Sequence, residues 1–290
     1  MKYAYFPGCS AESTARDQYM SVGEVARALG IELIEPNGWT CCGSTPAHHS
    51  NKILSIALPA ANLLMAQKMG LDMVVFCAAC YNRMKVANHE IKSSTEVRKE
   101  VAESLGEDYD GNVRVLHFTE VLVKEIGLQK LKKRFTHTLN GLKVASYYGC
   151  LLVRPQDATS FDDPENPTLI DQLVKSMGGE SIDWPHKVAC CGGGFAISRT
   201  DIVIELSNSI LEMAKSSEAV CIAVACPMCQ INLDMRQDNI NKIKNTGYEM
   251  PIVYITQLMG LCLGIPWQRL GLNKCIVSPK PVIEFVKEAV

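Results

Sequence analysis

The sequence lacks a strong charge of either sign. Its 29 Lys and Arg residues and its 31 Asp and Glu residues leave a formal net charge of −2 at pH 7. Proteins that bind nucleic acid or anionic membranes through their overall charge are strongly basic instead. We therefore expect no nucleic acid and no lipid surface among the partners of this chain.

Long apolar runs are also missing. The most apolar stretch, residues 252–267, has 16 residues and includes Thr256 and Gln257, whereas a transmembrane helix needs about 20 predominantly apolar residues. The N-terminal segment MKYAYFPGCS has neither the apolar core nor the cleavage site of a secretory signal. These absences predict a cytoplasmic protein with no membrane span.

Cysteine, by contrast, is abundant, with 13 residues. Cytosolic thiols stay reduced, so a disulfide framework is disfavoured, and the odd count disfavours it further. Two of the cysteines, Cys41 and Cys42, are consecutive. Consecutive Cα atoms lie ~3.8 Å apart, below the ~4.4–6.8 Å of ordinary disulfides. The remaining interpretations are core packing by scattered small thiols, or a group outside the chain that binds several sulfurs.

The order of the cysteines decides between these interpretations. The pattern C…CC…CxxC occurs twice, and 34 residues separate the CC pair from the CxxC motif both times. The flanking segments repeat as well: YFPGC resembles SYYGC, and VVFCAAC resembles AVACPMC. Chance does not place five cysteines twice with one gap conserved, so we infer an internal duplication. The predicted domains are residues 1–140 and 141–290.

Short apolar segments precede the cysteines, and segments of helical periodicity follow them. We expect strands at residues 2–6, 31–35, 72–76, 142–148 and 221–225, and helices at 15–30, 51–70 (kinked or restarted at Pro59), 81–92, 168–177, 201–216 and from 229. This alternation predicts an α/β protein made of two similar duplicated domains with mainly parallel sheets. The cysteine clusters would lie at the carboxyl ends of the strands, where such sheets carry their sites.

Five thiolates in each half indicate a metal centre. Structural zinc takes four ligands in a tetrahedron, whereas iron–sulfur clusters are polynuclear and are held by Cys thiolates. The C-x₂-C-x₂-C run of an ordinary ferredoxin is absent. The spacing therefore favours an unusual iron–sulfur cluster in each half over zinc, and zinc in one half is the alternative.

These motifs resemble the cysteine-rich CCG domain family over nearly the whole chain, because glycine follows each CC pair and PGC stands near the start. A chain made only of the tandem pair is most similar to the subunit designated B in heterodisulfide reductase of methanogenic archaea. The resemblance implies a non-cubane 4Fe–4S cluster in each half. The matching ligand positions are Cys9, Cys41, Cys42, Cys77 and Cys80, then Cys150, Cys190, Cys191, Cys226 and Cys229.

The family's reaction is reduction of the mixed disulfide of coenzyme M and coenzyme B to two thiols. Each cluster would supply one electron and bind one sulfur, so no catalytic side chain beyond the cluster irons is required. The resemblance further implies a multi-subunit complex. Its electrons come from a flavin subunit through a further subunit with cubane 4Fe–4S clusters, and a hydrogenase or formate dehydrogenase can join it.

Two other function classes remain open. One is an electron-transfer subunit of a glycolate or lactate oxidase or of a thiol:fumarate reductase, and the other is a zinc-held scaffold of a redox complex. Candidate residues for binding the sulfonate and phosphate of the family's substrate are His48, His49, Arg16, Arg154 and Arg199, each of which is as readily a surface residue. We expect Cys221 and Cys262 to pack in the core, and we assign no role to Cys275.

Overall fold

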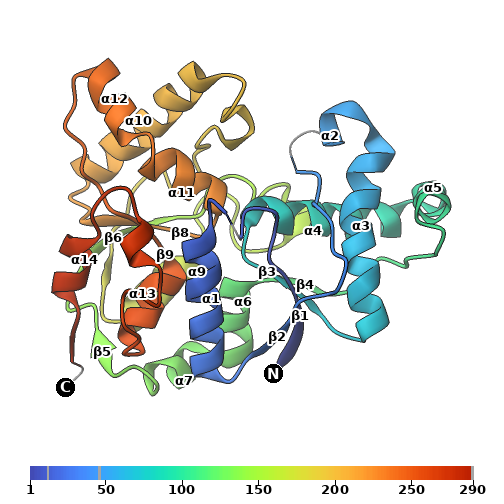
Figure 1. The fold of residues 1–290 in the computed structure, drawn as a ribbon, viewed down its shortest axis with the longest axis horizontal. Coiled ribbons are helices and arrows are strands. Elements are labelled where there is room, and N and C mark those ends of the chain that lie inside the picture. The colour runs from blue at the N-terminus through green and yellow to red at the C-terminus, as the bar shows by residue number, and fades with distance from the viewer. Residues whose placement is uncertain (12, 45–46, 289–290) are drawn as a thin grey trace.

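The computed structural model describes residues 1–11, 13–44 and 47–288, except for the side chains of residues 48 and 49. It contains two four-stranded parallel sheets with the same strand order (Figure 1). The first sheet has the order β2-β1-β3-β4, with β1 (Lys2–Phe6), β2 (Glu32–Ile34), β3 (Met73–Val75) and β4 (Val115–His117). The second has the order β7-β6-β8-β9, with β6 (Lys143–Tyr147), β7 (Glu180–Ser181), β8 (Cys221–Val224) and β9 (Ile252–Tyr254). The predicted duplicated α/β architecture is confirmed.

Helices connect these parallel strands, as the parallel order requires. In the first half they are α1 (Arg16–Leu29), α2 (Ala47–Ser50), α3 (Lys52–Met69), α4 (Ala78–Ser93), α5 (Thr95–Leu105), α6 (Phe118–Glu120), a π-helical turn (Val121–Ile126) and α7 (Leu128–Lys132). In the second half they are α8 (Gln156–Thr159), α9 (Leu169–Ser176), α10 (Thr200–Ser216), α11 (Pro227–Asp234), α12 (Gln237–Lys244), α13 (Ile255–Cys262) and α14 (Lys280–Phe285), with short 3₁₀ turns at Gly193–Phe195 and Leu272–Lys274.

A short antiparallel pair lies at the junction of the halves. Strand β5 (His137–Thr138) pairs with β10 (Lys287–Glu288), so the end of the described chain returns to the start of the second half. Apolar residues from the first half and from the second half belong to one continuous core that includes both sheets. The domain limits 1–140 and 141–290 remain a prediction.

Most expected elements appear within a few residues of their predicted limits. Helix α3 also keeps its predicted limits, but it runs unbroken from Lys52 to Met69 with Pro59 inside. Of the kink or restart expected at Pro59, the restart is therefore wrong, and the kink stays a prediction. Pro59 is buried together with its helix neighbours, and α3 packs along α4. This packing stabilises the helix across the hydrogen bond that proline cannot make.

Helix α1 joins the two halves. It belongs to the first half by sequence but packs against α13 of the second (Figure 1). The inner face of α1 carries buried polar side chains, and Ser21 Oγ lies 2.8 Å from Thr256 Oγ1 of α13. The apolar stretch predicted not to cross a membrane forms β9 and α13 inside the core. Within the described residues, no helix combines the length and the hydropathy that crossing a bilayer requires.

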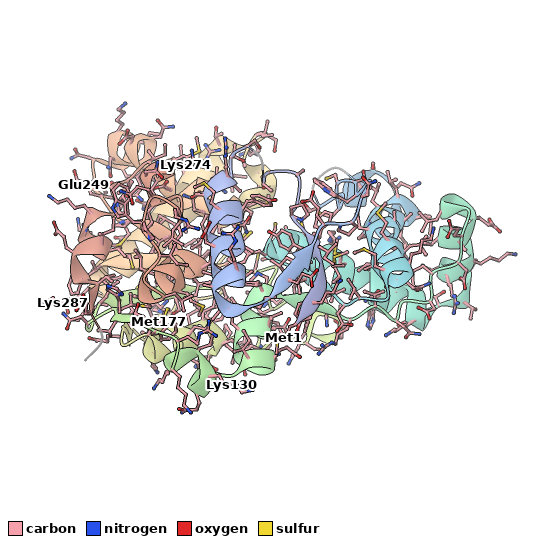
Figure 2. The ribbon with its side chains drawn as sticks, turned by 60° about the horizontal axis from the view of Figure 1, so that its bottom comes forward. Met1, Lys130, Met177, Glu249, Lys274 and Lys287 are labelled. Atoms are coloured by element: carbon pink, nitrogen blue, oxygen red, sulfur yellow. The ribbon has the colours of Figure 1, made fainter. Side chains whose placement is uncertain are left out.

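Asp17, at the start of α1, is predicted to make stability depend on pH. Burial raises the pKa of its carboxyl to about 6, with Asp234 adding to the increase and Lys274 opposing it; Figure 2 shows Lys274 close to this end of α1. Because the folded-state pKa lies above the ordinary value of 3.8, the stabilising contribution is complete below about pH 4 and is lost as pH rises through 6.

Asp17→Asn should therefore stabilise the protein at pH 7.5 by about 2 kcal/mol and flatten the decline in unfolding free energy between pH 4 and pH 7. Denaturant unfolding at several pH values measures both effects. The exposed Asp183 provides the control, since Asp183→Asn should leave the slope unchanged. If the unfolding free energy of Asp17→Asn declines with pH as steeply as that of the wild-type protein, this carboxyl is not the group that titrates.

Candidate metal centre

The repeat cysteines gather at the carboxyl ends of adjacent central strands. Cys9 follows β1 and Cys77 follows β3, and these strands are neighbours in the first sheet. The strand order reverses between β1 and β3, which is where parallel α/β sheets open a crevice for ligands. Cys150 and Cys226 follow β6 and β8 in the same way. The two halves therefore place equivalent cysteines at equivalent switch points.

Each CC pair folds over the CxxC motif of its own half. The Sγ atoms of Cys42 and Cys80 lie 3.2 Å apart, and those of Cys191 and Cys229 lie 3.4 Å apart. The glycine after each pair is required, because Gly43 and Gly192 have positive φ values of 70° and 75°. Their backbone amides donate to the first cysteine of the pair, with Gly43 N 3.4 Å from Cys41 Sγ and Gly192 N 3.3 Å from Cys190 Sγ.

Each CxxC motif forms the start of a helix. Cys77 is the N-cap of α4 and Cys226 is the N-cap of α11, and both have extended backbones. The helices begin earlier than the sequence predicted, at Ala78 and Pro227, so Cys80 and Cys229 lie in the first turn. At Cys226, the backbone amides of Met228 and Cys229 contribute to a lowered pKa and favour the thiolate, which is the form that binds metals. Hydrogen bonding with Cys42 and with Cys191 instead raises the pKa of Cys80 and of Cys229.

The turn that carries Cys150 is held by a buried hydrogen-bond and ion-pair network. The backbone amides of Tyr148 and Gly149 donate to Lys187 O at 2.8 and 3.1 Å. Lys187 Nζ lies 3.0 Å from Asp171 Oδ1 in a buried ion pair, and Tyr148 OH donates to the same carboxylate. These bonds fix the backbone so closely that a Cβ at Gly149 would lie 3.2 Å from Cys229 Sγ.

Cys9 and Cys150 are the remaining repeat cysteines of the two halves, and they are held less tightly than the CC and CxxC cysteines. The hydrogen bond between Cys150 and Cys190 raises the pKa of Cys150 and lowers that of Cys190 to about 6. In the first half, Cys41 donates a hydrogen bond to Cys42, which raises the pKa of Cys41, and desolvation and the nearby Cys9 add to the increase. Within the described residues, no three His, Cys, Asp or Glu side chains are arranged to hold a single metal ion.

The two cysteine groups also meet each other. Hydrogen bonding with Cys226 raises the pKa of Cys77, and hydrogen bonds with Cys229 and then Cys77 lower the pKa of Cys226. Both residues are buried. Cys77 and Cys226 are equivalent positions of the repeat, so the two CxxC motifs face each other across the junction between the halves.

A cavity of about 320 Å³ opens at the second group. All five repeat cysteines of the second half line its wall, namely Cys150, Cys190, Cys191, Cys226 and Cys229. The same half also contributes Tyr148, Gly149, Leu151, Gly193, Gly194, Phe195 and Met228. The first half contributes Ser44, Ala78, Ala79 and Arg83 to the wall. The cavity therefore lies between the halves, with the second CC and CxxC motifs on one side and the start of α4 on the other.

The family model for the cysteine-rich domain called CCG matches residues 3–85 and again residues 144–234. This chain belongs to the CCG family. The two matched segments run from β1 into α4 and from β6 to α11, which are the segments that carry the two cysteine groups. The resemblance inferred from the sequence is confirmed.

Related CCG proteins cover the chain almost completely. The chain is 31% identical to the 8-methylmenaquinol:fumarate reductase membrane anchor subunit of Wolinella succinogenes, over 96% of this chain and 97% of the relative. It is 30% identical to the subunit designated B in the ferredoxin/F(420)H(2)-dependent CoB-CoM heterodisulfide reductase of Methanosarcina acetivorans, over 98% and 96%. A crystal structure of a hypothetical protein from Helicobacter pylori is similar in fold, with a TM-score of 0.75, 10% identity, and coverage of 96% of this chain and 52% of that chain.

The cationic residues suggested by the sequence lie away from this CCG cavity. Arg16 is exposed at the first residue of α1. Arg154 pairs with Glu165 at 2.7 Å and Arg199 pairs with Asp201 at 2.7 Å, both near the surface. None of the three is among the residues that line the cavity. The backbone of His48 and His49 lies in α2, but their side chains are outside the described part of the chain.

Sequence reasoning missed Arg83, the cation that does line the cavity. Arg83 lies on α4 three residues after Cys80, so its spacing from the CxxC motif was the available signal. Its Nη2 donates to Asn82 Oδ1 at 2.7 Å, and among the described residues no carboxylate lies within ion-pair distance of it. Burial lowers the pKa of the guanidinium, and Cys42 opposes that shift. The repeat carries no cation at the equivalent Asn232, whose Nδ2 donates to Cys191 O at 3.0 Å.

The cysteines outside the repeat differ from the ten within it. Cys221 in β8 and Cys262 in α13 are fully buried, and burial raises the pKa of each thiol to about 12. Their expected role in core packing agrees with this burial. Cys275 is half-buried, and burial, with Asp234 and Asp17 nearby, raises its pKa as well. Nothing in the structure gives Cys275 a role.

Proposed function

We propose that the chain is the catalytic iron–sulfur subunit of a reductase that cleaves a small-molecule disulfide into two thiols. Each half would hold one non-cubane 4Fe–4S cluster through its five repeat cysteines, and the candidate substrate is the mixed disulfide of coenzyme M and coenzyme B. The observation that carries this proposal is the approach of the two CxxC motifs beside one cavity, since His117 Nε2 lies within hydrogen-bond distance of both Phe76 O and Ala225 O, in the residues before Cys77 and Cys226.

The donor set fits such clusters. Thiolates are the ligands that iron–sulfur clusters take, and each half of the repeat carries five cysteines, one more than structural zinc uses. Backbone amides already donate to Cys41 and Cys190. Hydrogen bonds of this kind to sulfur tune the reduction potential of a cluster.

The reaction needs two electrons and two protons: R–S–S–R′ + 2e⁻ + 2H⁺ gives R–SH and R′–SH. When bound, each cluster would supply one electron and an iron atom that a substrate sulfur can bind. The chain's own residues bind and enclose the substrate. The apolar wall from Leu151, Phe195 and Met228 contacts its carbon chain, and Arg83 pairs with an anionic group.

No carboxylic acid or histidine is among the described residues that line the cavity, and Tyr148 OH already donates to Asp171. The protons for the product thiolates therefore come from solvent. The electrons come from partner subunits of a larger cytoplasmic complex, as the resemblance implies, with one subunit that binds flavin and another that carries cubane clusters.

A second candidate function has its own support. The 31% identity to the membrane anchor subunit of a menaquinol:fumarate reductase favours an electron-transfer subunit that takes electrons from a quinol. In that function the clusters relay electrons, and disulfides are not substrates. The two candidates share the clusters and differ in the molecule that enters the cavity.

Anaerobic metal analysis tests the clusters first. We expect about four iron and four acid-labile sulfide per half, in a brown protein that loses colour in air. Stoichiometric zinc without sulfide would contradict both candidates and favour the scaffold. Turnover with a reduced viologen then separates the remaining two, because the disulfide reductase consumes a small disulfide, whereas the quinol-linked protein exchanges electrons only with a menaquinol analogue.

A further inference from the structure

His117 connects the two cysteine groups. It is the last residue of β4 and is fully buried. Its Nε2 atom lies 2.6 Å from Phe76 O and 3.2 Å from Ala225 O. Phe76 directly precedes Cys77, and Ala225 directly precedes Cys226. One imidazole nitrogen therefore contacts the backbone just ahead of both CxxC motifs, in two different sheets.

The surrounding hydrogen bonds fix the state of the ring. The backbone amide of Thr119 donates to Nδ1 at 3.3 Å, so Nδ1 is an acceptor and carries no proton. Nε2 then carries the proton and donates to two carbonyl oxygens, which only accept. Burial also lowers the pKa of the imidazole, which favours this neutral form. His117 is thus a shared donor in a defined tautomer.

The ring is also fixed in position by its neighbours. Phe76, Tyr81 and Phe161 surround it, with ring centroids 5.2, 5.9 and 6.0 Å away. Tyr81 belongs to the first half and Phe161 to the second, and Tyr81 OH donates across the junction to Thr159 O at 3.0 Å. Because aromatic side chains from both halves hold the imidazole ring in place, the two carbonyl groups that bond to it are held in position as well.

The repeat provides an internal comparison. Tyr254 is the last residue of β9, as His117 is the last residue of β4. Each is the N-cap of a short helix and forms a capping box with the residue three positions later. Yet Tyr254 OH is buried without a hydrogen-bond partner in the described structure. Of these two equivalent side chains, only that of His117 hydrogen-bonds to the residue that precedes each CxxC motif.

We propose that His117 is a positioning residue that sets the separation of the two metal centres, a role that rests on the proposed two-cluster function. Both sulfurs of one disulfide must be reached by the two centres at once, so the spacing of Cys77 and Cys226 has to bring the two centres within reach of one S–S bond. The shared Nε2–H fixes that span by bonding the residue before each cysteine. Misplacement of reacting groups by about 1 Å can lower rates by up to 10²-fold.

The test compares His117→Phe with Tyr254→Phe in the assembled, iron-loaded protein. Phenylalanine keeps an aromatic ring in the cage and removes the donor. We expect His117→Phe to retain iron and sulfide but to change the magnetic interaction between the two reduced clusters in EPR spectra. Its kcat should fall at least about tenfold with little change in KM. Tyr254→Phe should leave the EPR spectrum, kcat and KM unchanged, since its hydroxyl makes no bond within the described structure.

His117→Gln is the rescue variant, because its amide NH₂ group can donate to both carbonyls. It should restore the EPR interaction and most of kcat. If His117→Phe and His117→Gln both keep the EPR interaction of the wild-type protein, the positioning role is wrong. If His117→Phe loses iron and His117→Gln does not recover it, His117 supports cluster assembly, and the role proposed here is equally wrong. Absence of iron from the wild-type protein would instead overturn the proposed function.

Discussion

Replacing Cys42 with alanine is expected to abolish disulfide reduction, and replacing Cys191 is expected to do the same. Cleavage of one disulfide takes two electrons, and each proposed cluster supplies one. A protein with one intact cluster would have to store an electron elsewhere or release a thiyl radical. The loss should therefore be complete in each variant, well beyond the halving expected for two independent sites.

The structure decides which cysteines to replace. Cys42 and Cys191 contact Cys80 and Cys229 of their own halves, at 3.2 and 3.4 Å. Cys77 and Cys226 interact with each other as well as with Cys80 and Cys229 of their own halves, so changes there would disturb both groups at once. The CC positions are the sites at which one half can be damaged separately.

Iron analysis, EPR and turnover with a reduced viologen measure the outcome. Cys42→Ala and Cys191→Ala should each lose one cluster, whereas Cys221→Ala and Cys262→Ala should keep both clusters at a stability cost of about 1 kcal/mol. Substantial turnover in either CC variant with one cluster demonstrably missing would refute the two-cluster mechanism. Iron loss in Cys221→Ala would show that the proposed ligand set is incomplete.

Much of this arrangement could be predicted from the sequence because it depends on local patterns. Buried parallel strands are short apolar runs, and MVV in β3 and CIAV in β8 are such runs. The duplication was visible because the gap between CC and CxxC is the same in both halves. Gly43 and Gly192 explain why glycine follows each pair, since both positions require a positive φ.

The relation between the halves could not be predicted in this way. Sequence spacing places Cys77 and Cys226 at strand ends but says nothing about which surfaces of the two sheets meet. That meeting depends on packing between distant segments, such as α1 on α13 and Tyr81 on Phe161. The role of His117 depends on the same packing, because one of its two carbonyl partners lies in the other sheet.

The starts of the two helices at the CxxC motifs were predicted two or three residues too late for a related reason. Periodicity placed the helices after CxxC at Tyr81 and Cys229, because the preceding positions carry no amphipathic signal. The structure starts them at Ala78 and Pro227, with cysteine N-caps that no standard capping pattern indicates. The shift matters for function, because it places Cys80 and Cys229 in the first helical turn and Arg83 one turn further along the same helix.

Arg83→Met should lower kcat/KM about 100-fold for a disulfide that carries an anionic group, mainly through KM. A half-buried guanidinium without a carboxylate partner among the described residues gains a charge-assisted hydrogen bond when such a group enters the cavity. Bonds to charged groups contribute about 1.5–3 kcal/mol, and each ~1.4 kcal/mol is tenfold in affinity. Methionine keeps an unbranched apolar side chain at this position, so the wall of the cavity is largely retained.

The matched control is Arg154→Met, which removes an arginine that already pairs with Glu165 near the surface and should leave KM unchanged. Steady-state kinetics with an anionic disulfide and with a neutral one of similar size complete the test. The neutral substrate should respond little to Arg83→Met, and Arg83→Lys should recover part of the affinity for the anion. Equal losses for both substrates would mean that Arg83 stabilises α4 or the cluster. In that case the anion is bound elsewhere, and the cavity selects its substrate by apolar contact alone.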